Sequence, residues 1–115
     1  MTIAEKMLEL LDEGWGRTTL RSRWPGGEIK FRCAVGIRLD ADAMTCTVPE
    51  GLAGEALKGD PVIVAMARII REQYPETDQA DVSVEDVNLV MLFNDRYARL
   101  PDIRAVIEKT IAEGL

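Results

Sequence analysis

The 115-residue sequence contains no histidine and only two cysteines, Cys33 and Cys46. Histidine is the commonest general acid–base group and the usual partner of a catalytic serine or cysteine, so catalysis would have to rest on carboxylates, lysine or tyrosine. A structural zinc site normally needs four ligands, which two cysteines cannot supply. We expect both thiols to be reduced and mostly buried, with a disulfide as the less favoured alternative. The sequence therefore predicts a protein that is not an enzyme and holds no metal or cofactor, with a carboxylate-based enzyme as the alternative, which would need an acid with a raised pKa in a cleft.

Long apolar runs are also missing. No stretch reaches the length of a membrane-spanning helix, and the first fifteen residues lack the basic start and unbroken apolar segment of a secretory signal. These absences predict a cytosolic protein with no membrane partner. Apolar residues make up 47% of the chain and charged residues 30%, values typical of a folded domain, so we expect residues 1–115 to form one globular domain.

A helix is predicted close to the N-terminus. Thr2 and Glu5 have the spacing of a capping box, in which each side chain accepts a hydrogen bond from a backbone N–H at the start of the helix. Gly14 is the residue type that commonly ends a helix. The apolar residues between them recur on one helical face: Ile3, Met7, Leu10 and Leu11.

From residue 18 the apolar period changes to two, which is typical of strands. Pro25-Gly26-Gly27 divides this region and predicts the turn of a β-hairpin. We expect one dry face that packs against a helix, because an isolated two-stranded hairpin is marginal in water. That face would carry Leu20, Ser22 and Trp24 from the first strand and Ile29, Phe31 and Cys33 from the second.

The middle of the chain is more ambiguous. The segment CAVGIRLDADA, residues 33–43, would either prolong the second strand or begin a short helix, and we favour the helix. Residues 40–60 form a long connection rich in glycine, which is usually functional, mobile, or hides a short helix. Residues 52–57 are long enough for one or two helical turns.

Three features predict the helices of the C-terminal half. Asp60 and Pro61 combine an N-cap residue with a proline at the first helical position, so a helix is expected over 61–74, closed by Pro75. Ser83 is a good N-cap for a helix through VNLVMLF, although that apolar stretch would also suit a buried strand. Pro101 opens a last helix, stabilised by an Arg104–Glu108 pair, with Gly114 beyond its end. The fold class predicted is therefore α+β: a mainly helical single domain with four or five helices packed on one β-hairpin.

Asn94 and Asp95 lie between the last two predicted helices. We interpret them as a helix end, since asparagine tolerates the left-handed conformation and aspartate can cap the following turn. The alternative is a polar pair that lines a small site.

Several of these features occur together in a known family. A helix ending in Gly14-Trp15, a hairpin-like segment, Cys33-Ala34-Val35-Gly36 and later Asn94-Asp95 between two helices resemble a family of short uncharacterised proteins from actinobacteria and their phages, known as a domain of unknown function. The resemblance covers most of the chain, although the family has a shorter segment at residues 40–60. It implies a small, mainly helical domain, often encoded near accessory genes, with no established activity, and it assigns no catalytic residues to this chain.

A basic segment stands out in a chain whose formal net charge is −6. Residues 17–38 carry a net charge of +5, so the other 93 residues carry −11. Such separation lets one region attract an acidic partner while the rest repels it. The candidate partner-binding residues are Arg17, Arg21, Arg23, Lys30, Arg32 and Arg38, opposed within the segment by Glu28 alone. If the strands pair as predicted, Arg21, Arg23, Lys30 and Arg32 share one face.

These features predict a non-enzymatic protein-interaction or regulatory module, such as a phage accessory factor or a small inhibitor of the immunity-protein type, that binds an acidic protein surface. The alternative for the basic face is that it is simply solvated, or pairs with acids of the same chain. Nucleic acid is the less favoured partner, because a strong binder is usually basic overall and has stacking aromatics on the same face. A further alternative is a homodimer, in which a second chain would cover Val64 or Leu89.

The remaining candidate motifs are weak. Asp40 with Asp42, and Asp78 with Asp81, do not match a calcium loop, which needs a regular series of oxygen ligands closed by a glutamate. The glycines at 51, 54 and 59 lack the Lys-Ser/Thr of a phosphate-binding loop. We therefore predict no metal site.

Overall fold

The computed structural model describes residues 1–13, 21–23, 29–42, 44, 52–78 and 85–115. Within these ranges the α-helices are α1 (Ile3–Glu13), α2 (Ala34–Ala41), α3 (Ala53–Ala56), α4 (Pro61–Gln73), α5 (Asp86–Leu92) and α6 (Leu100–Ala112). A 3-10 helix, η3 (Pro75–Asp78), follows α4, and a π-helix, η4 (Phe93–Tyr97), prolongs α5. Two short strands, β1 (Arg21–Arg23) and β2 (Ile29–Arg32), precede α2.

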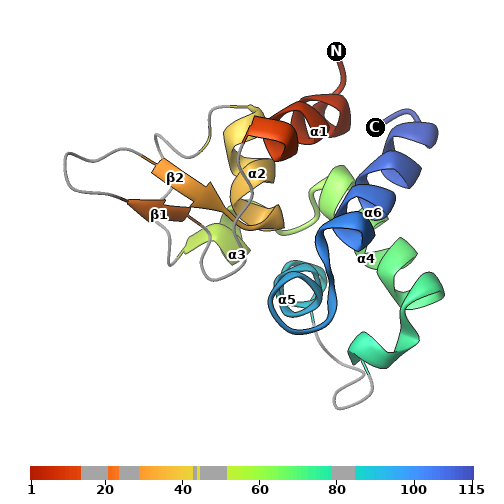
Figure 1. Cartoon of the computed structure of the whole chain (residues 1–115). Coiled ribbons are helices and arrows are strands. Elements are labelled where there is room, and N and C mark those ends of the chain that lie inside the picture. Colours follow the sequence, from red (N-terminus) through yellow and green to blue (C-terminus); the bar gives the residue numbers. More distant parts are fainter. Residues whose placement is uncertain (14–20, 24–28, 43, 45–51, 79–84) are drawn as a thin grey trace.

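The prediction of an α+β domain built on a β-hairpin is wrong, because the fold is mainly helical. Helices pack on helices: α1 contacts α2 and α6, α4 contacts α5 and α6, and α2 contacts α5 (Figure 1). The strands are three and four residues long and, over the described ranges, pair only with each other. The second strand ends one residue earlier than predicted, because Cys33 already occupies the N-cap position of α2. Residues 18–20 and 24–28 of the predicted hairpin lie outside the described ranges.

The core lies between the helices. Its largest fully buried side chains include Met7 of α1, Ile37 of α2 and Phe93 of η4. The apolar face predicted for α1 points into it, and so do the apolar residues of α4 and α6, since the amphipathic period of each helix places its apolar residues on one side. Tyr74 covers part of this core, with its ring centroid 4.8 Å from that of Phe93.

Local capping explains where two helices begin. The backbone N–H of Thr2 donates to Oε1 of Glu5 at 3.0 Å, and that of Glu5 donates to Oγ1 of Thr2 at 3.2 Å, so the predicted capping box is confirmed. Asp60 Oδ2 accepts from the N–H of Ile63 at 3.0 Å, with Pro61 at the first helical position, which confirms the predicted start of α4.

The other predicted helices are present, but one begins at a different cap from the one predicted. Residues 34–41 form the helix favoured over a strand, and a short helix is present at 53–56. Residues 86–92 are helical, but the N-cap is Glu85, and the predicted cap Ser83 lies outside the described residues. In α6 the Arg104 and Glu108 side chains pair at 3.7 Å, as predicted.

Asn94 and Asp95 do not end a helix, and this prediction is wrong. The chain continues from α5 directly into η4, which ends only at Tyr97. A π-helical turn continues the helix rather than ending it, so this polar pair lies inside a continuous helical segment.

The two ends of the chain meet, since the N–H of Ala4 donates to the backbone oxygen of Leu115 at 3.0 Å. No helix in the part of the chain that the structure describes is long and apolar enough to cross a membrane.

Candidate functional site

The basic segment contains the two strands. Their antiparallel register places Arg21 opposite Arg32 and Ser22 opposite Phe31, but Arg23 opposite Ile29 because of an irregularity between Ser22 and Arg23. Arg23 is therefore not the register partner of Lys30, and the strict alternation behind the predicted single basic face is interrupted. Arg17 lies outside the described residues, and only the backbone of the four strand residues is described.

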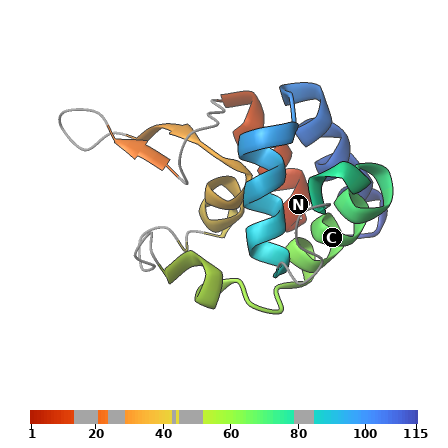
Figure 2. The same ribbon diagram turned by 90° about the horizontal axis from the view of Figure 1, so that it is seen from below.

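The strand pair stands to one side of the helical body. Figures 1 and 2, which differ by a quarter turn, both show β1 and β2 directed away from α4 and α6. β2 contacts α2, into which the chain runs through Cys33. Four of the seven strand residues are basic, so a concentrated positive charge is held away from most of the acidic chain.

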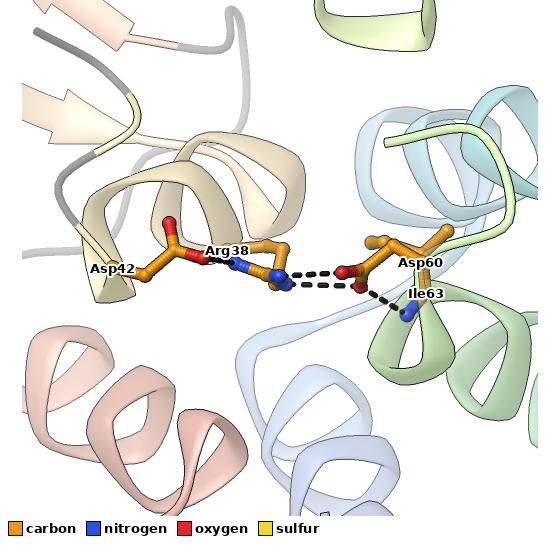
Figure 3. A network of polar contacts seen from close by, with 4 residues as sticks. All are labelled: Arg38, Asp42, Asp60 and Ile63. Atoms are coloured by element: carbon orange, nitrogen blue, oxygen red, sulfur yellow. Dashed lines mark hydrogen bonds and ion pairs between the residues drawn. The ribbon is translucent and has the colours of Figure 1, made fainter. Parts of the chain in front are cut away.

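Arg38 is separated from the rest of the basic segment. It lies in α2, is only 5% exposed, and donates hydrogen bonds to two carboxylates (Figure 3). Nε lies 3.0 Å from Oδ2 of Asp60, Nη2 lies 2.5 Å from Oδ1 of Asp60, and Nη1 lies 2.9 Å from Oδ2 of Asp42. Burial opposes the charge of Arg38, but the hydrogen bonds to Asp60 and Asp42 outweigh it and raise the pKa of the guanidinium.

Asp60 therefore has two roles. Its Oδ2 atom caps α4 through the N–H of Ile63, and both of its carboxylate oxygens accept from Arg38, which ties α2 to the start of α4 (Figure 3). The sequence indicates the first role by the Asp-Pro pair, but gives no signal for the second. With two carboxylates around it, the Arg38 guanidinium is engaged inside the protein and is not part of the candidate partner surface.

Asn94 is a structural link that sequence reasoning missed. The side chain is fully buried, and its Oδ1 atom accepts a hydrogen bond from the N–H of Ala34 at 3.1 Å. Ala34 is the first residue of α2, whose leading N–H groups have no partner within the helix. Since the N-cap residue Cys33 makes no side-chain cap, Asn94 supplies an acceptor from 60 positions away. Its Nδ2 atom donates to Asp95 Oδ1 at 2.9 Å.

Cys33 is free and buried, which confirms the expectation of a reduced, buried thiol at this position. Burial raises the pKa of the thiol from 9.0 to about 11, so the nucleophilic thiolate is scarce at neutral pH. Cys46 lies outside the described residues.

The acidic pairs considered from the sequence are not brought together as a metal site. Asp42 is paired with Arg38, and Asp81 lies outside the described ranges. Among the residues whose placement is described, no group of three or more cysteine, aspartate or glutamate side chains could hold a metal ion.

Comparison of the chain with protein-family models, curated proteins and solved structures gives no match. The resemblance to the actinobacterial family therefore stays a prediction.

Proposed function

We propose that this protein is a non-enzymatic interaction or regulatory module that binds an acidic protein surface through the basic residues of its strand pair. The residues concerned are Arg17, Arg21, Arg23, Lys30 and Arg32. A cytosolic location and membership of the resembling family belong to the same proposal and rest on the sequence.

One observation carries the proposal: the strand pair, with four basic residues in seven, projects from a helical body that packs largely on itself. Residues 17–32 carry five basic residues and one acidic residue, so the remainder of the chain has a net charge of −10. A positive projection on an acidic body steers an acidic partner toward one place and repels it elsewhere. Arg38 differs because its charge is matched by Asp42 and Asp60.

Three of the described carboxylates have structural roles, which supports a non-enzymatic function. Asp60 caps α4 and pairs with Arg38, Asp102 accepts from the N–H of Arg99 at 2.9 Å at the start of α6, and Glu5 belongs to the capping box of α1. A hydrogen bond from the backbone of Thr2 lowers the pKa of Glu5, the opposite of what a general acid needs.

The test is a charge reversal with a control of matched net charge. Both four-site variants change the formal net charge from −6 to −14, and they differ only in where the charge is changed. The strand variant carries Arg21→Glu, Arg23→Glu, Lys30→Glu and Arg32→Glu. The control carries Lys6→Glu, Arg68→Glu, Arg99→Glu and Lys109→Glu, all on helices or their caps.

Each form is used for quantitative affinity capture from the native host, and the captured protein is then titrated directly at several salt concentrations. We expect a partner with an acidic surface that is lost with the strand variant and retained with the control. Capture of the same proteins by both variants would contradict the proposal. Salt-dependent binding of labelled DNA or RNA that only the strand variant loses would replace the protein partner by nucleic acid.

A further inference from the structure

A cavity of about 240 Å³ lies between the segment that joins α3 to α4 and the N-terminal end of α5. Figure 2 shows the cyan start of α5 beside the yellow-green α3–α4 segment. The lining residues are Gly54, Leu57, Lys58, Gly59, Glu85, Asp86 and Val87. None of them belongs to the basic segment, so the cavity is independent of the surface discussed above.

The inner part of the cavity is apolar. Leu57 and Val87 are buried, with 1% and 4% of their surfaces exposed. Gly54 and Gly59 contribute no side chain, and a Cβ atom added at either position would meet no other atom within 4 Å. The glycines therefore leave open a space that larger residues would occupy.

Charged side chains of opposite sign lie at the edge of the cavity. Lys58 and Glu85 are both exposed and line the same cavity, yet neither has an ion-pair partner among the described residues. Asp86 differs, since its Oδ1 atom lies 2.8 Å from Nη1 of Arg71. The cavity thus offers the cation Lys58 and two anions, of which Asp86 is already paired with Arg71 and Glu85 is not paired with a described residue, together with an apolar floor.

We propose that this cavity binds a free apolar α-amino acid. The ammonium group would pair with Glu85, the carboxylate would pair with Lys58, and the side chain would lie on Leu57 and Val87. The volume is below that of pockets for drug-sized ligands and corresponds to about eight water molecules, a size that suits an amino acid such as leucine or valine. A ligand with a single charge would leave one of the two edge residues unpaired.

The direct test is calorimetric titration of the full-length chain with L-leucine, L-isoleucine, L-valine and L-methionine. At least one is expected to bind, and removing either of its charges should weaken binding at least tenfold. For leucine the matched probes are leucinamide, which lacks the carboxylate, and 4-methylpentanoate, which lacks the ammonium. Absence of binding by all four amino acids, or equal binding of the singly charged analogues, would overturn the proposal.

Variants locate the site. Gly54→Leu places a side chain in the cavity and should abolish binding, while the helical position tolerates leucine better than glycine, so folding is retained. Lys58→Gln and Glu85→Gln should each weaken binding at least tenfold, whereas Lys109→Gln, an exposed lysine on α6 away from the cavity, should leave it unchanged. Thermal unfolding of each variant checks that it is folded.

Unchanged binding by a folded Gly54→Leu variant would show that the amino acid binds elsewhere, and would overturn the assignment. The four-site strand variant is expected to bind the amino acid as wild type does, since none of its positions lines the cavity. The amino-acid binding result can therefore fail or succeed independently of the partner-capture experiment.

Discussion

Arg38 and Asp60, 22 positions apart in the chain, are joined by two hydrogen bonds that tie α2 to the first turn of α4. Their side chains are only 6% and 12% exposed. Desolvation of both charges is costly, and the pair offsets that cost only while both partners are present. Loss of Arg38 therefore leaves the Asp60 carboxylate, which is largely shielded from water, without its ion-pair partner.

Replacing Arg38 by methionine is expected to lower the free energy of unfolding by about 3–5 kcal/mol, because Asp60 then keeps a buried charge without its partner. Adding Asp60→Asn should restore part of the loss, since asparagine removes the charge and retains an oxygen that can cap α4. Urea denaturation of the wild type, both single variants and the double variant measures the coupling.

An exposed arginine provides the control for this cycle. Arg68 on α4 is 47% exposed and pairs with Glu72 and Glu113 at the surface. Arg68→Met should therefore cost less than about 1 kcal/mol. A double variant less stable than Arg38→Met alone would show that Asp60 is not left uncompensated by the loss of Arg38.

The sequence was informative wherever a residue acts on its near neighbours. Thr2 and Glu5 cap a helix that starts between them, and Asp60 caps the helix that follows it directly. In these cases the partner lies within three positions, so spacing alone identifies the bond. The candidate cavity had no such signal, because Lys58 and Glu85 come from segments 27 positions apart.

Long-range contacts account for the failures. Its position in the sequence places Arg38 in the basic segment, whereas the fold brings the Asp60 carboxylate beside its guanidinium. Asn94 is a residue type that commonly ends a helix. In the structure its Oδ1 atom instead accepts a hydrogen bond from the N–H of Ala34, 60 positions away. The α+β prediction made the hairpin a main element of the fold, whereas the contacts between elements are mostly between helices.

The second prediction concerns Asn94. Asn94→Ala should lower the free energy of unfolding by about 1–3 kcal/mol, because the buried N–H of Ala34 loses its acceptor. The matched control is Asn88→Ala on the exposed side of α5, which should stay within about 0.5 kcal/mol of wild type. Urea denaturation measures the free energy of unfolding of both variants. Equal losses for the two substitutions would show that the Asn94 hydrogen bond does not stabilise the fold.

The third prediction is a loss of stability at high pH caused by Cys33. Because burial raises the pKa of this thiol from 9.0 to about 11, the thiol is protonated in both states below pH 9 and its contribution is then complete. Between pH 9 and 11 the unfolded chain releases a proton that the folded chain retains, so stability falls by about 1.4 kcal/mol per pH unit from this group.

The measurement compares chains with and without Cys33, both carrying Cys46→Ala so that one thiol remains at most. Urea denaturation at pH 8 and at pH 10.5 should show a steeper loss of stability with Cys33 present than in Cys33→Ala. Lysine and tyrosine titrate in the same range in both chains, so only the difference between them reports on the thiol. Identical pH dependence would rule out a raised pKa for Cys33.

The fourth prediction separates the two residues considered for a homodimer, Val64 and Leu89. Leu89 is fully buried within a single chain, so a second chain is not needed to cover it, whereas Val64 is 42% exposed on α4. Leu89→Ala should therefore cost about 2–5 kcal/mol by opening a cavity. Val64→Ala should change the free energy of unfolding by less than about 0.5 kcal/mol.

Sedimentation equilibrium then tests whether Val64 has a partner in solution. With a single exposed valine on α4, we expect a mass of 12.8 kDa that is unaffected by Val64→Lys. A doubled mass that Val64→Lys returns to 12.8 kDa would show instead that this face of α4 is an interface between two copies. In that event Val64→Ala would also lower stability in a concentration-dependent way, because dissociation and unfolding are then linked.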